Sequence, residues 1–246
     1  ITELDSQGTD DVSASASYIL SANIENLVLT GSGSINGTGN AIANIITGNS
    51  GANKLYADNT VGDGIGGGDQ LIGNGGNDTL YSGDGSNTLD GGDGTGDIAD
   101  YTLFSTSVTV TYDSFTAEVT KSAGGTDTLV DVESVRGSTV GDTFLISHAS
   151  SFYGGAGNDA MSDGTDGDGV HGLLYGDGGS DTLSAGVDGG QLFGGADADT
   201  LIADTVATAK ISMTGGAGAD RFDIGANYNG SGGALADGTV AATTEI

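Results

Sequence analysis

Two short segments rich in glycine and aspartate combine residue types that can bind a cation. Gly-Asp-Gly-Gly-Ser-Asp-Thr-Leu ends at Leu183, and Gly-Gly-Ala-Asp-Ala-Asp-Thr-Leu ends eighteen residues later at Leu201. Asp181 and Asp199 hold the same place in the two copies. Carboxylate and carbonyl oxygens are the ligands that Ca²⁺ prefers, and glycine lets a backbone bend until several carbonyls point inward. The two segments are therefore candidate calcium-binding turns.

A weaker copy between these segments ends at Leu192, so large apolar residues recur every nine residues from Leu183 to Leu201. Six residues of mostly Gly, Asp and Asn favour a turn, whereas the closing Thr-Leu or Gln-Leu favours a very short strand. Gly and Asp are also ordinary turn formers, but ordinary turns do not recur on a strict register of nine. The pattern therefore predicts alternating turns and short strands.

This repeat resembles the nonapeptide Gly-Gly-x-Gly-x-Asp-x-(apolar)-x of the RTX calcium-binding proteins, which fold as a parallel β-roll. The resemblance implies that two nonapeptides make one coil, so that turns eighteen residues apart stack on one edge and share calcium ions. It predicts an all-β chain: a calcium-stabilised β-solenoid in two blocks with an intervening β-hairpin. Several Ca²⁺ ions are then expected as the cofactor.

The expected ligands are the side chains at position six of each repeat, together with turn carbonyls. The side-chain candidates are Asp69, Asp78, Asn87, Asp159, Asp181, Asp199 and Asp220. The carbonyl candidates lie around Gly67, Gly76, Gly85, Gly157, Gly179, Gly195 and Gly218.

In the first block, four repeats end at Leu71, Leu80, Leu89 and Ile98, each nine residues after the last. This register pairs Asp69 with Asn87 on one edge, and Asp78 with Gly96 on the other. Asn44 and Asn53 stand where earlier repeats would have aspartate. Because an amide carries no charge, calcium binding at these two positions is expected to be weak or absent.

In the second block, Asp159, Asp181, Asp199 and Asp220 are separated by 22, 18 and 21 residues. The first and last of these spacings exceed two periods of nine by four and three residues, and the spacing between apolar residues shows the same two insertions. If these insertions form loops, the four aspartates lie along one edge. The opposite edge carries Gly172 and Gly190 at position six and should bind little calcium.

The sequence divides into five expected parts. These are a β lead-in (1–34), a first β-roll block (35–98), a hairpin or linker (99–138), a second β-roll block (139–224) and a Gly/Ala/Thr-rich tail or spacer (225–246). The hairpin is expected because residues 108–112 and 117–120 alternate at period two around a turn-forming Asp-Ser-Phe-Thr.

The composition excludes several classes of protein. Against 34 acidic residues there are 5 basic ones, a formal net charge of −29, which disfavours a compact state without cations and makes nucleic acid a poor partner. There is no cysteine for a disulfide or thiolate site, and no apolar run long enough for a membrane span. The chain has no Gly-x-Ser-x-Gly elbow, and its two histidines, His148 and His171, are expected in solvent-facing loops. We therefore expect no enzyme activity.

The expected function is that of a calcium-binding structural module in a secreted bacterial surface protein, either a surface-layer subunit or a large adhesin. The RTX resemblance implies type I secretion, with folding and self-assembly on external calcium. Expected partners are other copies, neighbouring repeats of the parent chain, or cell-surface polysaccharide. The alternative is the C-terminal secretion and folding module of an exported protease, lipase or alginate epimerase, and a carbohydrate-binding module is a third possibility. The sequence does not distinguish the first two.

Overall fold

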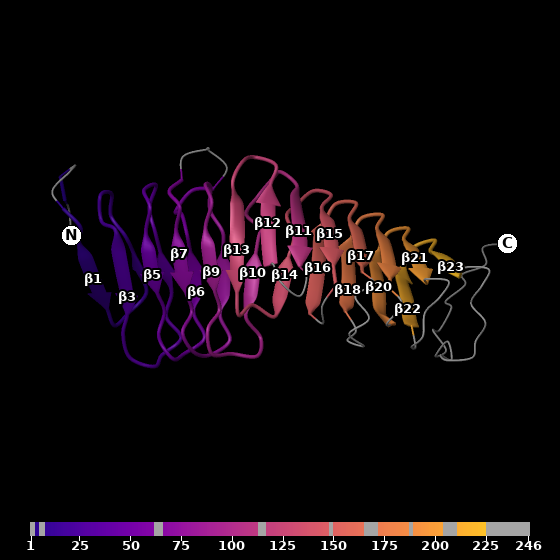
Figure 1. Cartoon of the computed structure of the whole chain (residues 1–246), viewed down its shortest axis with the longest axis horizontal. Coiled ribbons are helices and arrows are strands. Elements are labelled where there is room, and N and C mark those ends of the chain that lie inside the picture. Colours follow the sequence, from indigo (N-terminus) through magenta and orange to yellow (C-terminus); the bar gives the residue numbers. More distant parts are fainter. Residues whose placement is uncertain are drawn as a thin grey trace. The chain divides into compact units, whose positions relative to one another are not determined.

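A computed structural model describes residues 3–4, 8–61, 66–112, 117–147, 150–164, 172–186, 189–203 and 211–224. These residues form short strands and turns, with no helix among them (Figure 1). The predicted all-β fold is confirmed: parallel sheets form a β-solenoid of the β-roll kind. The expected tail, the two expected insertion loops and the Asp-Ser-Phe-Thr turn fall largely or wholly outside the described residues.

The chain divides into two compact units, which are described separately. Unit 1 comprises Ile1–Val108 and Thr116–Ser138, and unit 2 comprises Thr109–Phe115 and Thr139–Ile246.

The strands of unit 1 are β1 (Asp11–Ala14), β2 (Tyr18–Ile19), β3 (Asn26–Leu29), β4 (Gly37–Thr38), β5 (Ile45–Thr47), β6 (Lys54–Tyr56), β7 (Gln70–Ile72), β8 (Thr79–Tyr81), β9 (Thr88–Asp90), β10 (Ile98–Asp100), β12 (Ala117–Lys121), β13 (Thr126–Val130) and β14 (Ser134–Arg136). One parallel sheet has the order β1-β3-β5-β7-β9-β13, and the other has the order β2-β4-β6-β8-β10-β14. Up to β10, successive strands alternate between the sheets, so two strands make one coil.

The expected hairpin region has a different role in unit 1. β13 pairs in parallel with β9, and β14 pairs in parallel with β10, so both strands extend the roll. β12 pairs antiparallel with β13. The strands expected on either side of the hairpin turn are present as β11 and β12, but residues 113–116 lie outside the described part of the chain.

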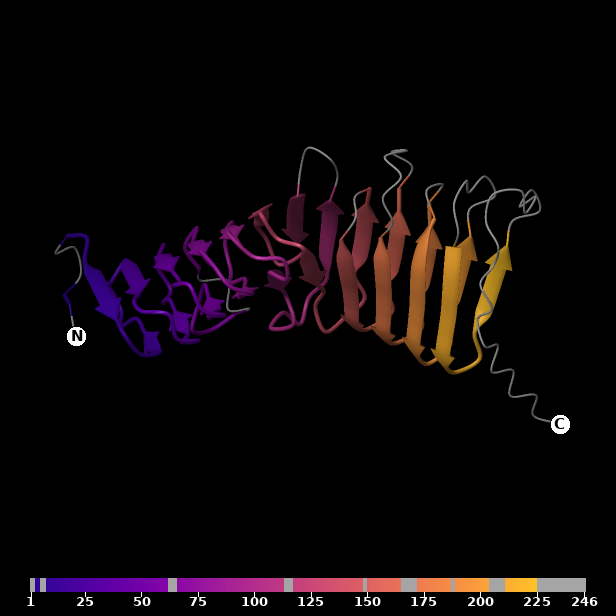
Figure 2. The same ribbon diagram turned by 90° about the horizontal axis from the view of Figure 1, so that it is seen from below.

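The strands of unit 2 are β11 (Val108–Tyr112), which begins one residue before it, β15 (Thr143–Ile146), β16 (Ser151–Ala156), β17 (Ala160–Asp163), β18 (Leu173–Gly178), β19 (Thr182–Ala185), β20 (Gly190–Ala196), β21 (Thr200–Ala203), β22 (Ile211–Ala217) and β23 (Arg221–Ile224). The parallel orders are β11-β15-β17-β19-β21-β23 and β16-β18-β20-β22. Figure 2 shows the strands of this unit side by side, one coil after another.

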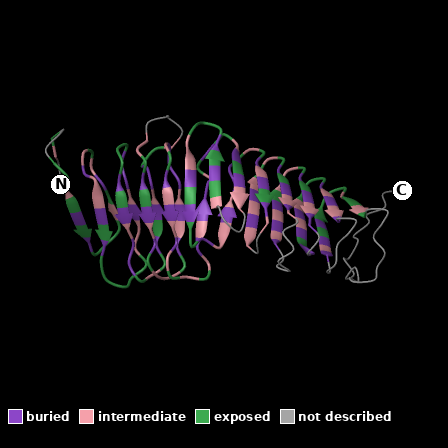
Figure 3. Cartoon of the chain, in the orientation of Figure 1, coloured by how far each residue is buried: buried purple, intermediate pink, exposed green. Residues whose placement is uncertain are grey.

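The core of each unit is a row of apolar side chains from the middle of the strands. In unit 1, Ile46, Leu71 and Leu89 are paired neighbours with no exposed surface. In unit 2, Leu183 and Leu201 pair as the nine-residue register predicts, and both are fully buried. Figure 3 shows this buried band through the middle of the strands. Because the side-chain period of a strand is two, the residues immediately before and after each core residue point away from the core.

The expected register at the end of the first block is wrong by one residue. Ala99, not Ile98, pairs with Leu80 and is fully buried, whereas Ile98 is only half-buried. The turn before β10 therefore contains one residue more than the nonapeptide, and Asp97, not Gly96, holds position six. A one-residue slip exchanges the two faces of a strand, so the core-facing residue here is the small Ala99.

Candidate cation sites

The four predicted aspartates of unit 2 form a ladder along one edge. The backbone N–H of Asp159 donates to Oδ1 of Asp181 at 2.8 Å, and that of Asp181 donates to Oδ1 of Asp199 at 2.9 Å. The N–H of Asp199 donates to Oδ1 of Asp220 at 3.1 Å. Asp142, in the preceding coil, donates to Asp159 at 2.7 Å in the same way. The predicted shared edge is therefore observed, since the strands that follow these residues pair in register.

The second carboxylate oxygen of these residues has a different environment. Oδ2 of Asp159, Asp181 and Asp199 is buried and has no hydrogen-bond partner. In Asp181 this oxygen lies against Gly176, five residues earlier, so closely that a Cβ at Gly176 would overlap it. The same Cβ would overlap the carbonyl oxygen of Gly194 in the next coil. A carboxylate oxygen without a hydrogen-bond partner and a carbonyl oxygen therefore both lie close to Gly176.

This arrangement recurs in neighbouring coils of unit 2. A Cβ at Gly194 would overlap both Oδ2 of Asp199 and the carbonyl oxygen of Gly215. A Cβ at Gly154 would overlap Oδ2 of Asp159 and approach the carbonyl oxygen of Gly176. A buried oxygen without a donor is costly, and a cation that contacts several such oxygens removes the cost.

The turns before the four predicted aspartates of unit 2 each contain two left-handed residues, two and four positions before the aspartate. Before Asp181 these are Gly179 (φ 125°) and Asp177 (φ 69°), and before Asp220 they are Gly218 (φ 133°) and Gly216 (φ 105°). Glycine adopts this conformation without strain, and aspartate tolerates it better than most residues. A Cβ at Gly179 would overlap the carbonyl oxygen of Gly157, so turn carbonyls point at the next turn.

Of the predicted carbonyl positions, Gly76, Gly85, Gly157, Gly179, Gly195 and Gly218 all have positive φ. Gly67 does not, but its carbonyl oxygen lies directly against Gly85 of the following coil. The predicted glycines therefore lie in stacked turns.

Replacement of Gly179 by alanine tests this close stacking. We expect Gly179→Ala to lower the free energy of unfolding by at least about 2 kcal/mol, since it combines a left-handed conformation with a backbone overlap. Urea unfolding in calcium measures the change. The adjacent Gly178→Ala is the matched control, because its Cβ would meet only the carbonyl oxygen of Gly155, at 3.7 Å, and its φ is not positive. Equal losses in the two variants would contradict the stacked-turn geometry.

In unit 1 the same ladder runs along both edges. Oδ1 of Asp69 accepts from the N–H of Asn44 at 2.7 Å, and Oδ1 of Asn87 accepts from Asp69 at 2.9 Å. On the other edge, Oδ1 of Asp78 accepts from Asn53 at 2.6 Å. These pairings place the predicted residues Asp69, Asp78 and Asn87 in equivalent turn positions.

Asp97 is a candidate ligand that the sequence register missed. Its Oδ1 accepts from the N–H of Asp78 at 2.6 Å, as the next member of that ladder. Oδ2 of Asp69, Asp78 and Asp97 is buried without a hydrogen-bond partner, as in unit 2. Gly96, predicted at this position, brings no side chain to the edge. The run Gly-Gly-Asp-Gly-Thr-Gly-Asp contains the turn signal, but one extra residue hides its register.

Where asparagine replaces aspartate, no side-chain oxygen is left without a donor: Oδ1 of Asn44 accepts from the N–H of Asn40 at 2.7 Å, and Oδ1 of Asn53 accepts from that of Asn49 at 2.8 Å. Nδ2 of Asn44 donates to the carbonyl oxygen of Ile24 at 2.9 Å, and Nδ2 of Asn53 donates to that of Ile35 at 2.7 Å. These carbonyls are satisfied by N–H groups. This geometry is consistent with the prediction that calcium binds weakly or not at all at the two asparagines.

The predicted poor edge of unit 2 carries no carboxylate at its two glycine positions. Gly172 and Gly190 bring no side chain, and the N–H of Gly172 donates to Oδ2 of Asp163 at 3.4 Å.

A separate acidic cluster that the sequence did not predict lies in unit 1, where carboxylate oxygens of Glu3, Asp10 and Glu25 fall within 4.8 Å of one another. The N–H of Asp10 donates to Glu25 at 2.8 Å.

Burial raises the pKa of the ladder carboxylates. Loss of water raises the pKa of Asp159 to about 7 and that of Asp181 to about 6, and neighbouring carboxylates add to both shifts. In unit 1, loss of water likewise raises the pKa of Asp69 to about 7 and that of Asp78 to about 6. In each case the backbone N–H that donates to the carboxylate opposes the shift.

The stability of the metal-free protein is therefore expected to fall as pH rises from about 4 to about 7. Below the ordinary pKa of 3.8, these carboxyl groups are protonated in both the folded and the unfolded state, and their contribution to the free energy of unfolding is fully present. As pH rises through the folded pKa values, the buried groups must ionise and the contribution is lost. The strand signal in circular dichroism in calcium-free buffer measures the trend, and it should be strongest near pH 4 and weaken toward pH 7. Stability that rises with pH in that buffer would contradict it.

Comparison of the sequence with protein-family models and with curated proteins finds no match. In the described part of the chain, no helix could span a membrane.

Proposed function

We propose that this protein is a calcium-binding β-roll module with a structural role. The observation that carries the proposal is the repeated row of buried Oδ2 atoms, each without a donor, in coils whose neighbouring carbonyl oxygens face the same space. Folding buries these oxygens and offers them no proton donor. A cation between coils is the simplest group that can contact such an Oδ2 and the carbonyl oxygen beside it at once.

The chemistry of the oxygens favours calcium over other metals. The ladder offers carboxylate and carbonyl oxygens only, and the sequence contains no cysteine. Hard oxygen ligands in a flexible, many-membered shell suit Ca²⁺, whereas Zn²⁺ favours nitrogen and sulfur and Mg²⁺ demands a small octahedral shell. The net charge of −29 gives the chain a general need for cations as well.

The proposed setting is outside a bacterial cell, as the RTX resemblance implies. The coils with unpartnered Oδ2 atoms would stay unfolded where calcium is scarce and would fold at about 10⁻⁴ to 10⁻³ M calcium, the range of extracellular modules. Two compact units of the same plan favour a long structural protein, such as a surface-layer subunit or an adhesin, over the folding module of an exported enzyme. Other copies of the chain are the proposed partners.

Calcium titration by isothermal calorimetry tests the proposal. We expect several ions per chain, with dissociation constants in the range of about 10⁻⁴ to 10⁻³ M, because several coils repeat the same oxygen arrangement. Magnesium at the same concentrations is the control and should produce much weaker binding. A chain that binds no more calcium than magnesium would contradict the proposal.

A further inference from the structure

One carboxylate of unit 1 belongs to the ladder but differs from all the others described above. Asp127 is the second residue of β13, and its Oδ1 accepts from the N–H of Asn87 at 2.8 Å, as position six does in other coils. Its Oδ2, however, accepts from the hydroxyls of Ser82 at 2.5 Å and Tyr101 at 2.9 Å. Asp127 therefore has no unpartnered oxygen, although it is fully buried.

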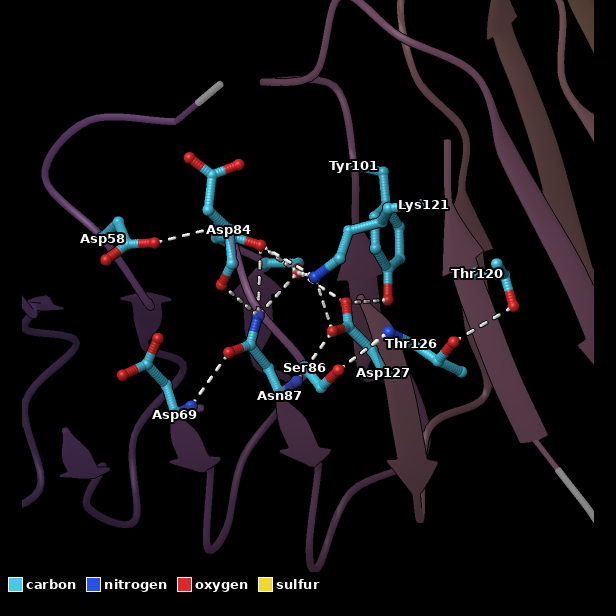
Figure 4. A network of polar contacts seen from close by, with 12 residues as sticks. Asp58, Asp69, Asp84, Ser86, Asn87, Tyr101, Thr120, Lys121, Thr126 and Asp127 are labelled. Atoms are coloured by element: carbon cyan, nitrogen blue, oxygen red, sulfur yellow. Dashed lines mark hydrogen bonds and ion pairs between the residues drawn. The ribbon is translucent and has the colours of Figure 1, made fainter. Parts of the chain in front are cut away.

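The charge of Asp127 is matched by a lysine from the same chain. Nζ of Lys121, at the end of β12, lies 2.6 Å from Oδ1 of Asp127, and both side chains have no exposed surface (Figure 4). The ammonium also donates to the carbonyl oxygen of Gly83 at 2.8 Å and to the hydroxyl of Ser82 at 3.2 Å. It lies 5.6 Å from the centre of the Phe104 ring, a cation–π distance.

The ligands of this ammonium are of the kinds that a calcium ion would use. A carboxylate, a turn carbonyl and a hydroxyl surround it, and all three are oxygens. Burial raises the pKa of the neighbouring Tyr101 well above its ordinary value, so its hydroxyl keeps the proton that it donates. In the adjacent turn, Nδ2 of Asn87 donates to Gly83 at 3.1 Å, so donors already occupy the space between these coils.

We propose that the ammonium of Lys121 is a built-in cation that takes the place of calcium between the Asn87 and Asp127 coils. This end of unit 1 therefore folds without metal, whereas the coils with unpartnered Oδ2 atoms fold only when calcium binds. The inference rests on the proposed function for those other coils. The antiparallel strand β12 makes the substitution possible, because it brings a long cationic side chain into the interior of the roll.

Hydrogen exchange of the full chain, with and without a calcium chelator, tests the inference. We expect the N–H of Asn87, which donates to Asp127, to stay protected in chelator, while the N–H groups of Asp159 and Asp181 lose protection. Loss of protection at Asn87 together with the unit 2 amides would overturn the inference.

Lys121→Met removes the charge and keeps most of the side-chain volume. In chelator it should reduce protection at Asn87 by about a hundredfold or more, because it leaves a buried carboxylate without its cation. Lys54→Met is the control, since Lys54 is exposed and should leave protection at Asn87 unchanged. Unchanged protection in Lys121→Met would overturn the inference.

Lys121→Ser adds a gain-of-binding measurement. The shorter side chain leaves room beside Asp127 and the Gly83 carbonyl, so calorimetry should count one more calcium ion than in the wild type, and the same count would overturn the inference. A wild type that binds no calcium would instead overturn the proposed function. Calcium-dependent protection at Asn87 in a wild type that does bind calcium would overturn the inference alone.

Discussion

Chelation of calcium is expected to unfold unit 2, with loss of its strand signal in circular dichroism and recovery when calcium returns. Without the ion, the buried Oδ2 atoms of Asp159, Asp181 and Asp199 have no partner and their negative charges repel. A site that is saturated a hundredfold above its dissociation constant contributes about 2.7 kcal/mol. Several such sites together approach the whole stability of a typical domain, about 5 to 15 kcal/mol.

Magnesium provides the control for this experiment, because it demands a smaller and more regular shell of ligands. Equal magnesium should restore little of the strand signal. A strand spectrum that chelation leaves unchanged would contradict the prediction and the proposed function with it.

The Asp181→Asn variant is expected to lose calcium binding on both sides of its coil. Asp181 accepts from Asp159 and donates to Asp199, so it borders two gaps. The structure already shows what an amide does at such a position, because Oδ1 of Asn87 keeps the ladder bond and its Nδ2 donates to the carbonyl oxygen of Gly83 at 3.1 Å. In Asp181→Asn the new N–H group should likewise occupy the site, and binding at the two gaps should weaken about tenfold to a hundredfold.

Two further substitutions make this test specific to position. Asp220 is the last aspartate of the described ladder, so Asp220→Asn should disturb only the gap toward Asp199. Asp223→Asn is the control, because that side chain is 45% exposed and pairs with Arg221 at 2.7 Å. Calorimetry compares the number of ions and their affinities in the three variants. If Asp223→Asn lost as much binding as Asp181→Asn, the aspartates would act only as a diffuse acidic surface.

The sequence was sufficient to predict the fold class and the ladder of unit 2. The period of nine, with apolar residues at Leu183 and Leu201, determines which residues face the core. Where two aspartates are more than eighteen residues apart, the extra residues lie between the repeats, so the aspartates still align on one edge. The same rule failed at Asp97, because one extra turn residue shifted the strand by one and exchanged its faces. A strict period cannot reveal an insertion of one residue unless the strand with which the shifted strand pairs is also known.

The Lys121 site was missed for a different reason. Gly124-Gly125-Thr126-Asp127-Thr128-Leu129 carries the turn signal, but the alternating strands around it indicate a hairpin equally well. Which strand pairs with β9 depends on contacts forty residues apart, since Asp127 lies beside Asn87. Local pattern contains no information on that choice. Sequence therefore predicted the coils with unpartnered Oδ2 atoms and missed the coil in which Lys121 pairs with the buried carboxylate.

The ladder of backbone donors and Oδ1 acceptors also has a direction. In the ladder of unit 2, the carboxylates of Asp159, Asp181, Asp199 and Asp220 each accept from the coil nearer the N-terminus. Each coil thus contacts only its two neighbours, and an ordered coil needs an ordered neighbour to complete its own bonds. At limiting calcium, order should spread between adjacent coils as in a one-dimensional chain. A half-loaded roll would then consist of one contiguous ordered run with a single boundary, rather than ordered coils scattered along its length.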